Sequence, residues 1–216
     1  MIEISPAILT SEIVEFQNQL NELTGFKSID IDVIRHPFVD NTTLQIQEVV
    51  NFLEKLTQIN FGFHLMVEFP LEDLVFLRAS FFKDRNLRIY IHQEAEISKL
   101  DSFGWPELWQ RGITVKLESE LREISYYQNY PEVQLMSIKT GWQGGKFDSA
   151  VLQKVEFLRK NGFTGKISLD GGVNLETAQL IKDSDINRVS VGSLFSKSHE
   201  DRKIFEELNN ILNSTM

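Results

Sequence analysis

Residues 27–34 read KSIDIDVI, an apolar run in which Asp30 and Asp32 alternate with isoleucine and valine. A period of two is typical of a β-strand, and it places both aspartates on the same face of that strand. Isolated acids at the inner end of a buried strand are costly unless a metal ion or a reaction compensates them. This stretch therefore predicts a strand that ends in a pair of carboxylates, with capping of nearby backbone or contact with water as the simpler alternative.

Seven more apolar runs of similar length accompany this one along the chain. All eight together span residues 3–9, 28–34, 62–67, 87–92, 113–117, 133–138, 166–169 and 188–191. Helical periodicity follows most of them, at 13–23, 46–56, 151–158 and 204–212. Eight strand–helix units in 216 residues predict a single α/β domain over residues 1–216, a (β/α)8 TIM barrel. An open doubly wound sheet is the competing architecture, but it usually has fewer strands, and no G-x-G-x-x-G follows the first run.

The strand–helix pattern is weakest in its fourth and fifth units. Residues 96–110, EISKLDSFGWPELWQ, contain a proline and two tryptophans. A proline inside a helix removes a hydrogen bond and clashes with the preceding turn. The fourth helix is therefore expected to be short or broken.

Composition excludes several classes of function. The formal net charge is −9, which argues against a general nucleic-acid binder, although a local pocket can still attract a small anion. The absence of cysteine excludes disulfides, thiolate catalysis and cysteine-based zinc sites. The first residues lack the basic region of a signal peptide, and no apolar run reaches the length of a membrane span. We expect a cytoplasmic protein that acts neither on nucleic acid nor in a membrane.

Two further ligand-type residues stand in other apolar runs. His64 lies in FGFHLMVEFP, residues 61–70, and Asp170 closes KISLD at residues 166–170. A single histidine in such a run is more often a core residue, but together with Asp30 and Asp32 it favours a divalent cation. Because the carboxyl ends of barrel strands meet at one face, these side chains are expected to converge there.

Glycines follow the last three runs. Gly171 and Gly172 come directly after Asp170, and Gly192 and Ser193 follow the eighth run, where barrels of this class commonly bind phosphate through backbone N–H groups. Residues 141–145, GWQGG, follow the sixth run and suggest a loop that folds over a ligand. Ordinary turns are the alternative at each of these places.

In these motifs the chain resembles the ribulose-phosphate 3-epimerase family over essentially its whole length. The matching motifs are ISPAIL (4–9), IDIDV (29–33), FVDN (38–41), HLMVEFP (64–70), MSIKTGWQGGKF (136–147), LDGGVN (169–174) and VGS (191–193). The third-strand and seventh-strand motifs are the most specific of these.

The resemblance implies an epimerase of pentose phosphate metabolism with one divalent metal ion, Mn²⁺, Fe²⁺, Mg²⁺ or Zn²⁺, at the barrel mouth. It implies that two aspartates exchange the C3 proton of a phosphorylated ketose from opposite faces, and relatives are often homo-oligomers. On matching positions the catalytic pair is Asp32 and Asp170, and the metal ligands are Asp30, Asp32, His64 and Asp170. Residues implied to bind the sugar phosphate are His64, Gly141, Trp142, Gln143, Gly144, Gly171, Gly172, Gly192 and Ser193; Met66 and Met136 match positions that cover the planar intermediate.

The chain departs from the family pattern around this site. Asp30 replaces a histidine, so the implied shell holds three carboxylates and one imidazole, a harder set that favours Mn²⁺, Fe²⁺ or Mg²⁺ over Zn²⁺. Ala7 replaces a serine, and Trp142 and Gln143 replace phenylalanine and glycine. Further departures put Ile34, Arg35 and His36 in place of Met-Asp-Gly, and Lys139 and Thr140 in place of Asn-Pro. The clustering of these departures around the site suggests altered substrate choice or lost activity. Arg35, His36 and Lys139 add positive charge that suits an anionic ligand, unless these residues pair with nearby acids at the surface.

Two other functions remain open at this stage. The changes at Ala7 and Asp30 are compatible with a non-catalytic barrel of the same family that binds a sugar phosphate or a protein. Lys139, at the end of the sixth run, would suit a lyase or aldolase that forms a Schiff base.

Overall fold

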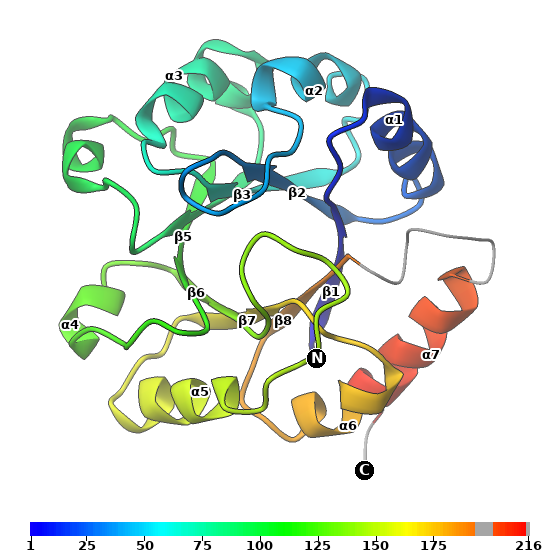
Figure 1. Cartoon of the computed structure of the whole chain (residues 1–216), viewed down its shortest axis with the longest axis vertical. Helices are drawn as coiled ribbons and strands as arrows, with labels where there is room; N and C mark the ends of the chain where they lie inside the picture. Colours follow the sequence, from blue (N-terminus) through cyan, green and yellow to red (C-terminus); the bar gives the residue numbers. More distant parts are fainter. Residues whose placement is uncertain (193–200, 215–216) are drawn as a thin grey trace.

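Eight parallel strands form a closed barrel in chain order in the computed structural model, which describes residues 1–192 and 201–214 (Figure 1). Its strands are β1 (Glu3–Ile8), β2 (Ser28–Ile34), β3 (Asn60–Met66), β4 (Leu87–His92), β5 (Trp109–Val115), β6 (Glu132–Met136), β7 (Lys166–Asp170) and β8 (Arg188–Val191). β1 pairs with both β2 and β8, and Ile4 lies opposite Val189 in the closing pair. The predicted (β/α)8 barrel is confirmed, and the open sheet is excluded.

Helices surround the barrel, and the helical layer is least complete between β4 and β6. They are α1 (Ile13–Glu22), α2 (Ile46–Leu53), α3 (Leu71–Ala79), α4 (Ile124–Tyr127), α5 (Val151–Lys160), α6 (Leu175–Lys182) and α7 (Asp201–Asn213). Between β4 and β5 the described chain forms only the 3₁₀ helix η2, Ser98–Ser102. Gly104 with φ +69° and then Pro106 follow it, and neither residue favours continuation of a helix. The expected interruption of the fourth helix is confirmed.

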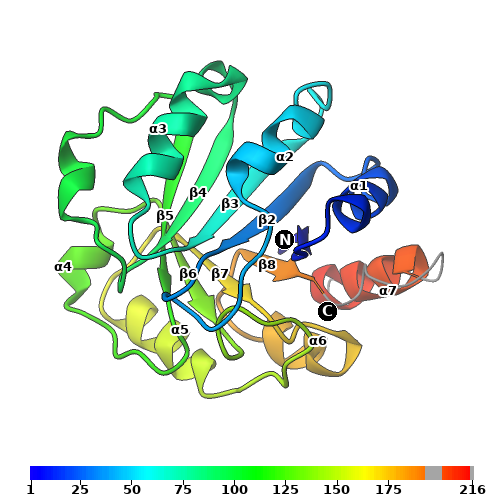
Figure 2. The ribbon, with the colours of Figure 1, turned by 45° about the horizontal axis from the view of Figure 1, so that its top comes forward.

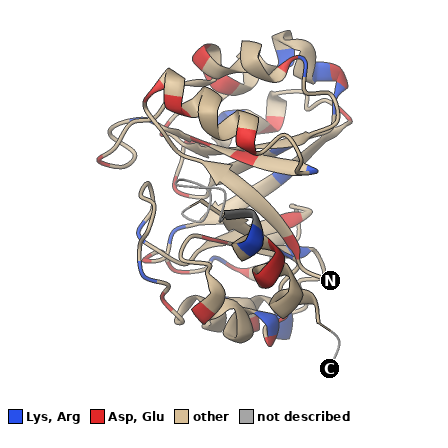
Figure 3. Cartoon of the chain, turned by 90° about the vertical axis from the view of Figure 1, so that its right-hand side faces the viewer, with Lys and Arg blue, Asp and Glu red and all other residues tan. Residues whose placement is uncertain are grey.

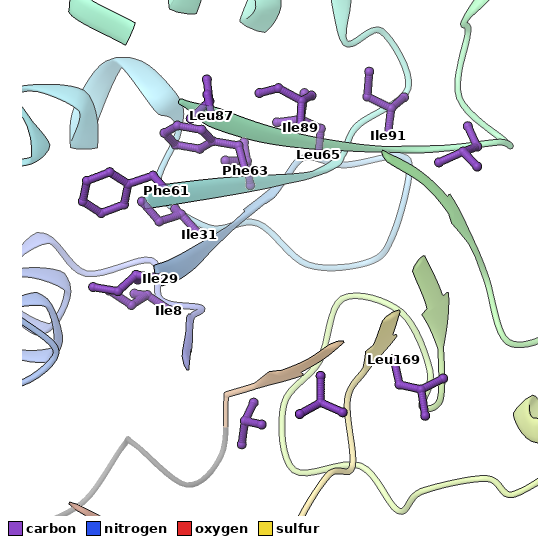
Figure 4. Packing of buried hydrophobic residues seen from close by; sticks show 14 of the residues in the cluster. Ile8, Ile29, Ile31, Phe61, Phe63, Leu65, Leu87, Ile89, Ile91 and Leu169 are labelled. Carbon is purple, nitrogen blue, oxygen red and sulfur yellow. The ribbon is translucent and has the colours of Figure 1, made fainter. Parts of the chain in front are cut away.

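The outward faces of the strands supply the apolar core beneath the helices. Ile29 and Ile31 of β2, Phe63 of β3 and Ile89 of β4 are all buried in this layer (Figure 4). Because side chains alternate along a strand, their neighbours Asp30, Asp32 and His64 point toward the barrel axis. The alternation that identified β2 therefore separates the core from the interior of the barrel.

The interior of the barrel is unusually polar for this fold, which more often fills it with branched apolar side chains. Arg188 at the start of β8 is 1% exposed and forms an ion pair with Asp30. The same guanidinium donates to the Tyr90 hydroxyl at 2.6 Å, and that hydroxyl donates to Glu132 at 3.1 Å. Gly62 and Gly112 leave the room for Asp30 and Tyr90, since a Cβ at either glycine would overlap them. A buried ionic network thus holds together strands from opposite sides of the barrel.

The fifth strand begins four residues before the apolar run that predicted it. Its first part continues the pairing with β4, with Trp109 opposite Leu87 and Arg111 opposite Ile89. Gln110 and Arg111 are exposed, so hydrophobicity did not reveal this part of the strand.

Acidic and basic residues are interspersed along the helices on the face that Figure 3 presents. Among the described residues, no helix combines the length and the apolar character needed to cross a membrane.

Candidate metal centre and active site

Three of the predicted ligand residues meet at one end of the barrel. Asp32 of β2 lies opposite His64 of β3 in the strand pairing, and Asp170 is the last residue of β7. One ligand atom from each residue lies within 4.8 Å of the other two. All three side chains are buried, His64 most completely at 1% exposure. Residues 32, 64 and 170, distant in the chain, therefore form one compact Asp–His–Asp group.

The atoms at the centre of this group lack hydrogen bonds. His64 Nδ1 lies 2.9 Å from Asp170 Oδ2 and 3.2 Å from Asp32 Oδ1. Neither approach has hydrogen-bond geometry, so His64 Nδ1 and Asp32 Oδ1 are buried without a hydrogen-bond partner. Imidazole nitrogen and carboxylate oxygen are common ligands of divalent metal ions in proteins. The donor set and its unsatisfied atoms fit a metal ion.

Electrostatics also favour a cation at this point. Burial raises the pKa of Asp32 to about 6, despite the opposing effect of His64. Burial would lower the pKa of His64, but the adjoining Asp170 and Asp32 carboxylates raise it to about 9. The pair of acids thus stabilises positive charge on or beside the imidazole, whether a proton or a metal ion carries it.

The structure does not bring Asp30 into this group. Its carboxylate accepts from Ser190 Oγ at 2.8 Å and pairs with Arg188. Burial alone would raise the pKa of Asp30, but Arg188, Arg88 and Ser190 together lower it. The expectation that Asp30 is a fourth ligand does not fit this geometry. Without it the group holds two carboxylates and one imidazole, so the preference for harder metals loses its basis.

A second histidine, which the sequence pattern did not single out, completes the polar cluster. His92 ends β4 and is fully buried, with its Nε2 2.8 Å from His64 Nε2. Its Nδ1 lies 3.4 Å from Glu94 Oε2. Burial lowers the pKa of His92 to about 3, so this ring is neutral. The signal that found His64, a histidine at the carboxyl end of a strand, would have found His92 too.

A small cavity adjoins the Asp–His–Asp group. It is lined by Ala7, Leu9, Asp32, Met66, Met136, Ile138, Gly141, Trp142, Gln143, Gly144, Asp170, Gly171, Gly172, Val173, Val191 and Gly192. Of the residues predicted to contact substrate, His64 does not line this cavity and Ser193 lies outside the described residues; the others all line it. Gly171 and Gly172 have φ of +95° and +65°, a conformation that turns the chain directly after Asp170.

In this arrangement the cavity is too small for a sugar phosphate. Its volume is about 20 Å³, room for about one water molecule. The Gln143 side chain reaches Gly192, where an added Cβ would overlap its amide. Trp142 covers the cavity from outside and is 48% exposed.

Two loops close this end of the barrel, as Figures 1 and 2 show: the loop after β2 and the loop after β6. Asn41 Nδ2 of the first loop donates to the Gly141 carbonyl of the second at 2.7 Å. Thr43 ties the first loop to the Asp32 carbonyl at 2.7 Å. Entry of a larger ligand therefore requires a change in the loop that carries Gly141 and Gln143.

The extra positive charges near the mouth do not line this cavity. Arg35 makes two hydrogen bonds to Asp73, at 2.9 and 3.3 Å, so it pairs with a nearby acid as the alternative expected, although this acid is buried. His36 and Lys139 are exposed and are not among the residues lining the cavity. The structure thus offers no support for Lys139 as a Schiff-base amine.

Comparison with known proteins identifies the family. The ribulose-phosphate 3 epimerase family model matches residues 3–196. Ribulose-phosphate 3-epimerase of Bacillus subtilis is 26% identical over 96% of this chain and 98% of its own length. That of Methanocaldococcus jannaschii is 27% identical over 91% of this chain and 86% of its own.

Solved structures with lower identity show the same fold. The 3-keto-L-gulonate-6-phosphate decarboxylase of Vibrio cholerae has a TM-score of 0.67 and 13% identity, over 98% of this chain and 97% of that one. The N-(5'-phosphoribosyl)anthranilate isomerase of Pyrococcus furiosus has a TM-score of 0.62 and 12% identity over the whole of both chains. The family match confirms the expectation of an epimerase-like enzyme. The chain belongs to the ribulose-phosphate 3-epimerase family.

Proposed function

We propose that this protein is a metal-dependent epimerase that inverts C3 of a phosphorylated ketose of the ribulose 5-phosphate and xylulose 5-phosphate type. The observation that carries the proposal is the convergence of Asp32, His64 and Asp170, whose ligand atoms lie within 4.8 Å of one another. Curated relatives matched over nearly their full length are ribulose-phosphate 3-epimerases.

In this proposal Asp32, His64 and Asp170 hold the metal ion. A bound divalent cation supplies electrostatic stabilisation for negative charge that develops beside the ketone. Asp32 and Asp170 come from β2 and β7 and line one cavity, so each carboxylate can take or return a proton at C3 from its own side. Met66 and Met136, which are 1% and 3% exposed, line the same cavity and keep water away from the reacting carbon.

The glycine-rich segments are assigned to the phosphate end of the substrate. Gly171, Gly172 and Gly192 line the cavity beyond Asp170, and Gly141 and Gly144 approach from the loop after β6. Backbone N–H groups at such positions bind phosphate without any basic side chain. Ser193, also predicted here, is part of the proposal on sequence alone.

The metal site gives the first prediction. We expect the purified protein to bind one equivalent of Mn²⁺ in calorimetric titration. His64→Ala should weaken binding by at least about a hundredfold, more than the 10–100-fold typical of residues that only support a ligand. His36→Ala is the matched control, because this exposed histidine lies on the neighbouring loop, and it should leave the affinity unchanged. Wild-type protein that binds no divalent metal would contradict the proposal.

The activity itself is tested by proton exchange. Ribulose 5-phosphate incubated in D₂O with the Mn²⁺-loaded protein should acquire deuterium at C3 and convert to its C3 epimer, as followed by NMR. Absence of deuterium at C3 with every pentulose and hexulose phosphate tried would rule out the epimerase.

A second function, a non-catalytic barrel that binds a sugar phosphate, is favoured by one specific observation. Gln143 stands where the family has glycine, and its side chain fills the space beside Gly192. Binding of ribulose 5-phosphate without any C3 exchange in metal-loaded protein would support this second function over the first.

Gln143 gives a further prediction. Gln143→Gly should open the cavity toward Gly192 and lower KM for ribulose 5-phosphate by about tenfold, equivalent to about 1.4 kcal/mol, with little change in kcat. Gln143→Asn, one methylene shorter, should give an intermediate KM. Steady-state kinetics on the three proteins would measure this, and a higher KM in Gln143→Gly would show that the amide binds substrate instead.

A further inference from the structure

The Asp–His–Asp group is extended by two residues, His92 and Glu94, that the proposed reaction does not use. His92 is 0% exposed, and its ring lies between His64 and the Glu94 carboxylate. The Phe38 ring packs against it with centroids 5.0 Å apart. Phe38 is itself held by Lys116, whose Nζ lies 3.9 Å from the Phe38 ring centroid and donates to its carbonyl at 3.3 Å. Contacts with His64, Glu94 and Phe38 therefore fix the position of the His92 ring.

The contact between the two imidazoles has the geometry of a hydrogen bond. The two Nε2 atoms are 2.8 Å apart, the ring centroids 4.9 Å apart, and the ring planes are inclined by only 17°. Because the nitrogens are much closer than the centroids, the rings meet edge to edge in nearly one plane. One proton must lie between the two nitrogens, since two lone pairs or two N–H groups would repel at this distance.

Glu94 indicates on which ring that proton resides. His92 Nδ1 lies 3.4 Å from Glu94 Oε2, without hydrogen-bond geometry, and an ionised carboxylate attracts an N–H and repels a nitrogen lone pair. A neutral His92 therefore carries its proton on Nδ1 and accepts at Nε2. His64 must then donate from its Nε2, and its Nδ1 is directed at Asp32 and Asp170. A metal ion at Nδ1 would replace the second proton that these two carboxylates otherwise stabilise there.

We propose that His92, supported by Glu94, is a positioning residue that holds His64 in the tautomer and orientation in which Nδ1 binds the metal ion. Metal-binding histidines commonly donate their second N–H to a carboxylate or carbonyl, which fixes the ring and raises its basicity. Here a neutral histidine takes that place and passes the interaction on to a carboxylate. This inference rests on the proposed metal site.

The test compares two substitutions of similar size at one position. Gln can accept from His64 Nε2 through its oxygen while its NH₂ group faces Glu94, whereas Met offers only a weakly accepting sulfur. We expect His92→Met to weaken Mn²⁺ binding by about 10–100-fold in calorimetric titration, and His92→Gln to remain within a few-fold of wild type. Equal affinities in wild type and His92→Met would overturn the inference.

Glu94→Gln provides a second, more conservative variant, since Glu94 is partly exposed with 23% of its side chain accessible. It should weaken binding by a smaller factor. Glu96→Gln removes the same charge two residues away from an exposed position, and it should have no effect. An equal loss in Glu94→Gln and Glu96→Gln would indicate general electrostatics and contradict a positioning role.

A spectroscopic measurement separates positioning from simple loss of folding. In zinc-loaded protein with ¹⁵N-labelled histidine, His64 Nδ1 should carry no proton, and its Nε2–H should show the downfield shift of a strong hydrogen bond. His92→Met should move that proton to the shift of an unpaired N–H, and His92→Gln should restore it. If wild-type protein binds metal but His64 binds through Nε2, the inference fails while the proposed function stands. If wild-type protein binds no metal, both fail.

Discussion

Asp32→Asn and Asp170→Asn are each expected to slow epimerisation strongly while leaving proton exchange of one epimer intact. Asparagine keeps the size of the side chain but cannot accept a proton, and general acid–base groups contribute roughly 10²–10⁴-fold to rate. Each variant should therefore lower the rate of conversion between ribulose 5-phosphate and its C3 epimer by about that factor.

The two variants should also differ in a reciprocal way. If each carboxylate serves one face of C3, the remaining carboxylate can still remove and return the proton of the epimer that it faces. In D₂O, one variant should incorporate deuterium into ribulose 5-phosphate without converting it, and the other should do so only with xylulose 5-phosphate. NMR of both epimers with each variant measures this directly.

Because both aspartates also belong to the proposed metal site, the measurement is made at saturating Mn²⁺. Asp40→Asn is the matched control, since this exposed acid lies on the loop after β2, and it should retain full activity. Conversion within tenfold of wild type in both Asp32→Asn and Asp170→Asn would contradict proton transfer by this pair.

The second large effect is expected from the ionic network inside the barrel. Arg188→Met should lower the free energy of unfolding by about 3–5 kcal/mol, because it removes the guanidinium that pairs with the buried Asp30 and Glu132 carboxylates. This is a large share of the roughly 5–15 kcal/mol by which a folded protein is stable. Urea denaturation followed by circular dichroism gives the value.

Two further variants test whether the loss of stability comes from the uncompensated buried charges. Arg88→Met breaks the ion pair with Glu3, in which the side chains of Arg88 and Glu3 are 11% and 42% exposed, and should cost less than Arg188→Met because this pair is only partly removed from water. The double variant Asp30→Asn with Arg188→Met should recover part of the loss, because it removes one of the uncompensated charges. A loss below 1 kcal/mol in Arg188→Met would show that the network does not stabilise the barrel.

A substitution at Asp30 distinguishes its predicted role as a metal ligand from its observed role as the ion-pair partner of Arg188. Asp30→Asn should reduce stability while leaving the affinity and stoichiometry of Mn²⁺ binding unchanged, since the structure pairs this carboxylate with Arg188 and Ser190. A clear loss of metal affinity in Asp30→Asn would restore it as a ligand.

Asp30 and Asp32 have different partners in the structure, a difference that the alternation along β2 does not predict. Alternation along β2 correctly placed both side chains toward the barrel axis, but two residues along a strand also represent a rise of about 6.6 Å. Asp32 consequently reaches the mouth, while Asp30 lies one layer deeper. A period of two identifies the face of a strand and carries no information about depth relative to other strands.

The contact between His92 and His64 could not be predicted for a related reason. It closes a run that was correctly predicted as a strand, yet nothing in the run indicates that its imidazole meets that of His64. The pairing of β3 with β4 brings the two residues together, and His64 lies directly opposite Tyr90 rather than His92. The tilt of neighbouring strands around the closed barrel decides which side chains share a layer.

By itself, the amino-acid sequence determined the barrel, because eight apolar runs of strand length separated by helical periods leave few other ways to bury their faces. It also determined that Asp32, His64 and Asp170 lie near the carboxyl ends of their strands. In a parallel barrel all these ends lie at the same face. Only the tertiary structure decided that Asp30 pairs with Arg188, that His92 contacts His64 and that Gln143 fills the space beside Gly192. These contacts join residues far apart in the chain, and their partners follow from the closure and stagger of the barrel rather than from any local pattern.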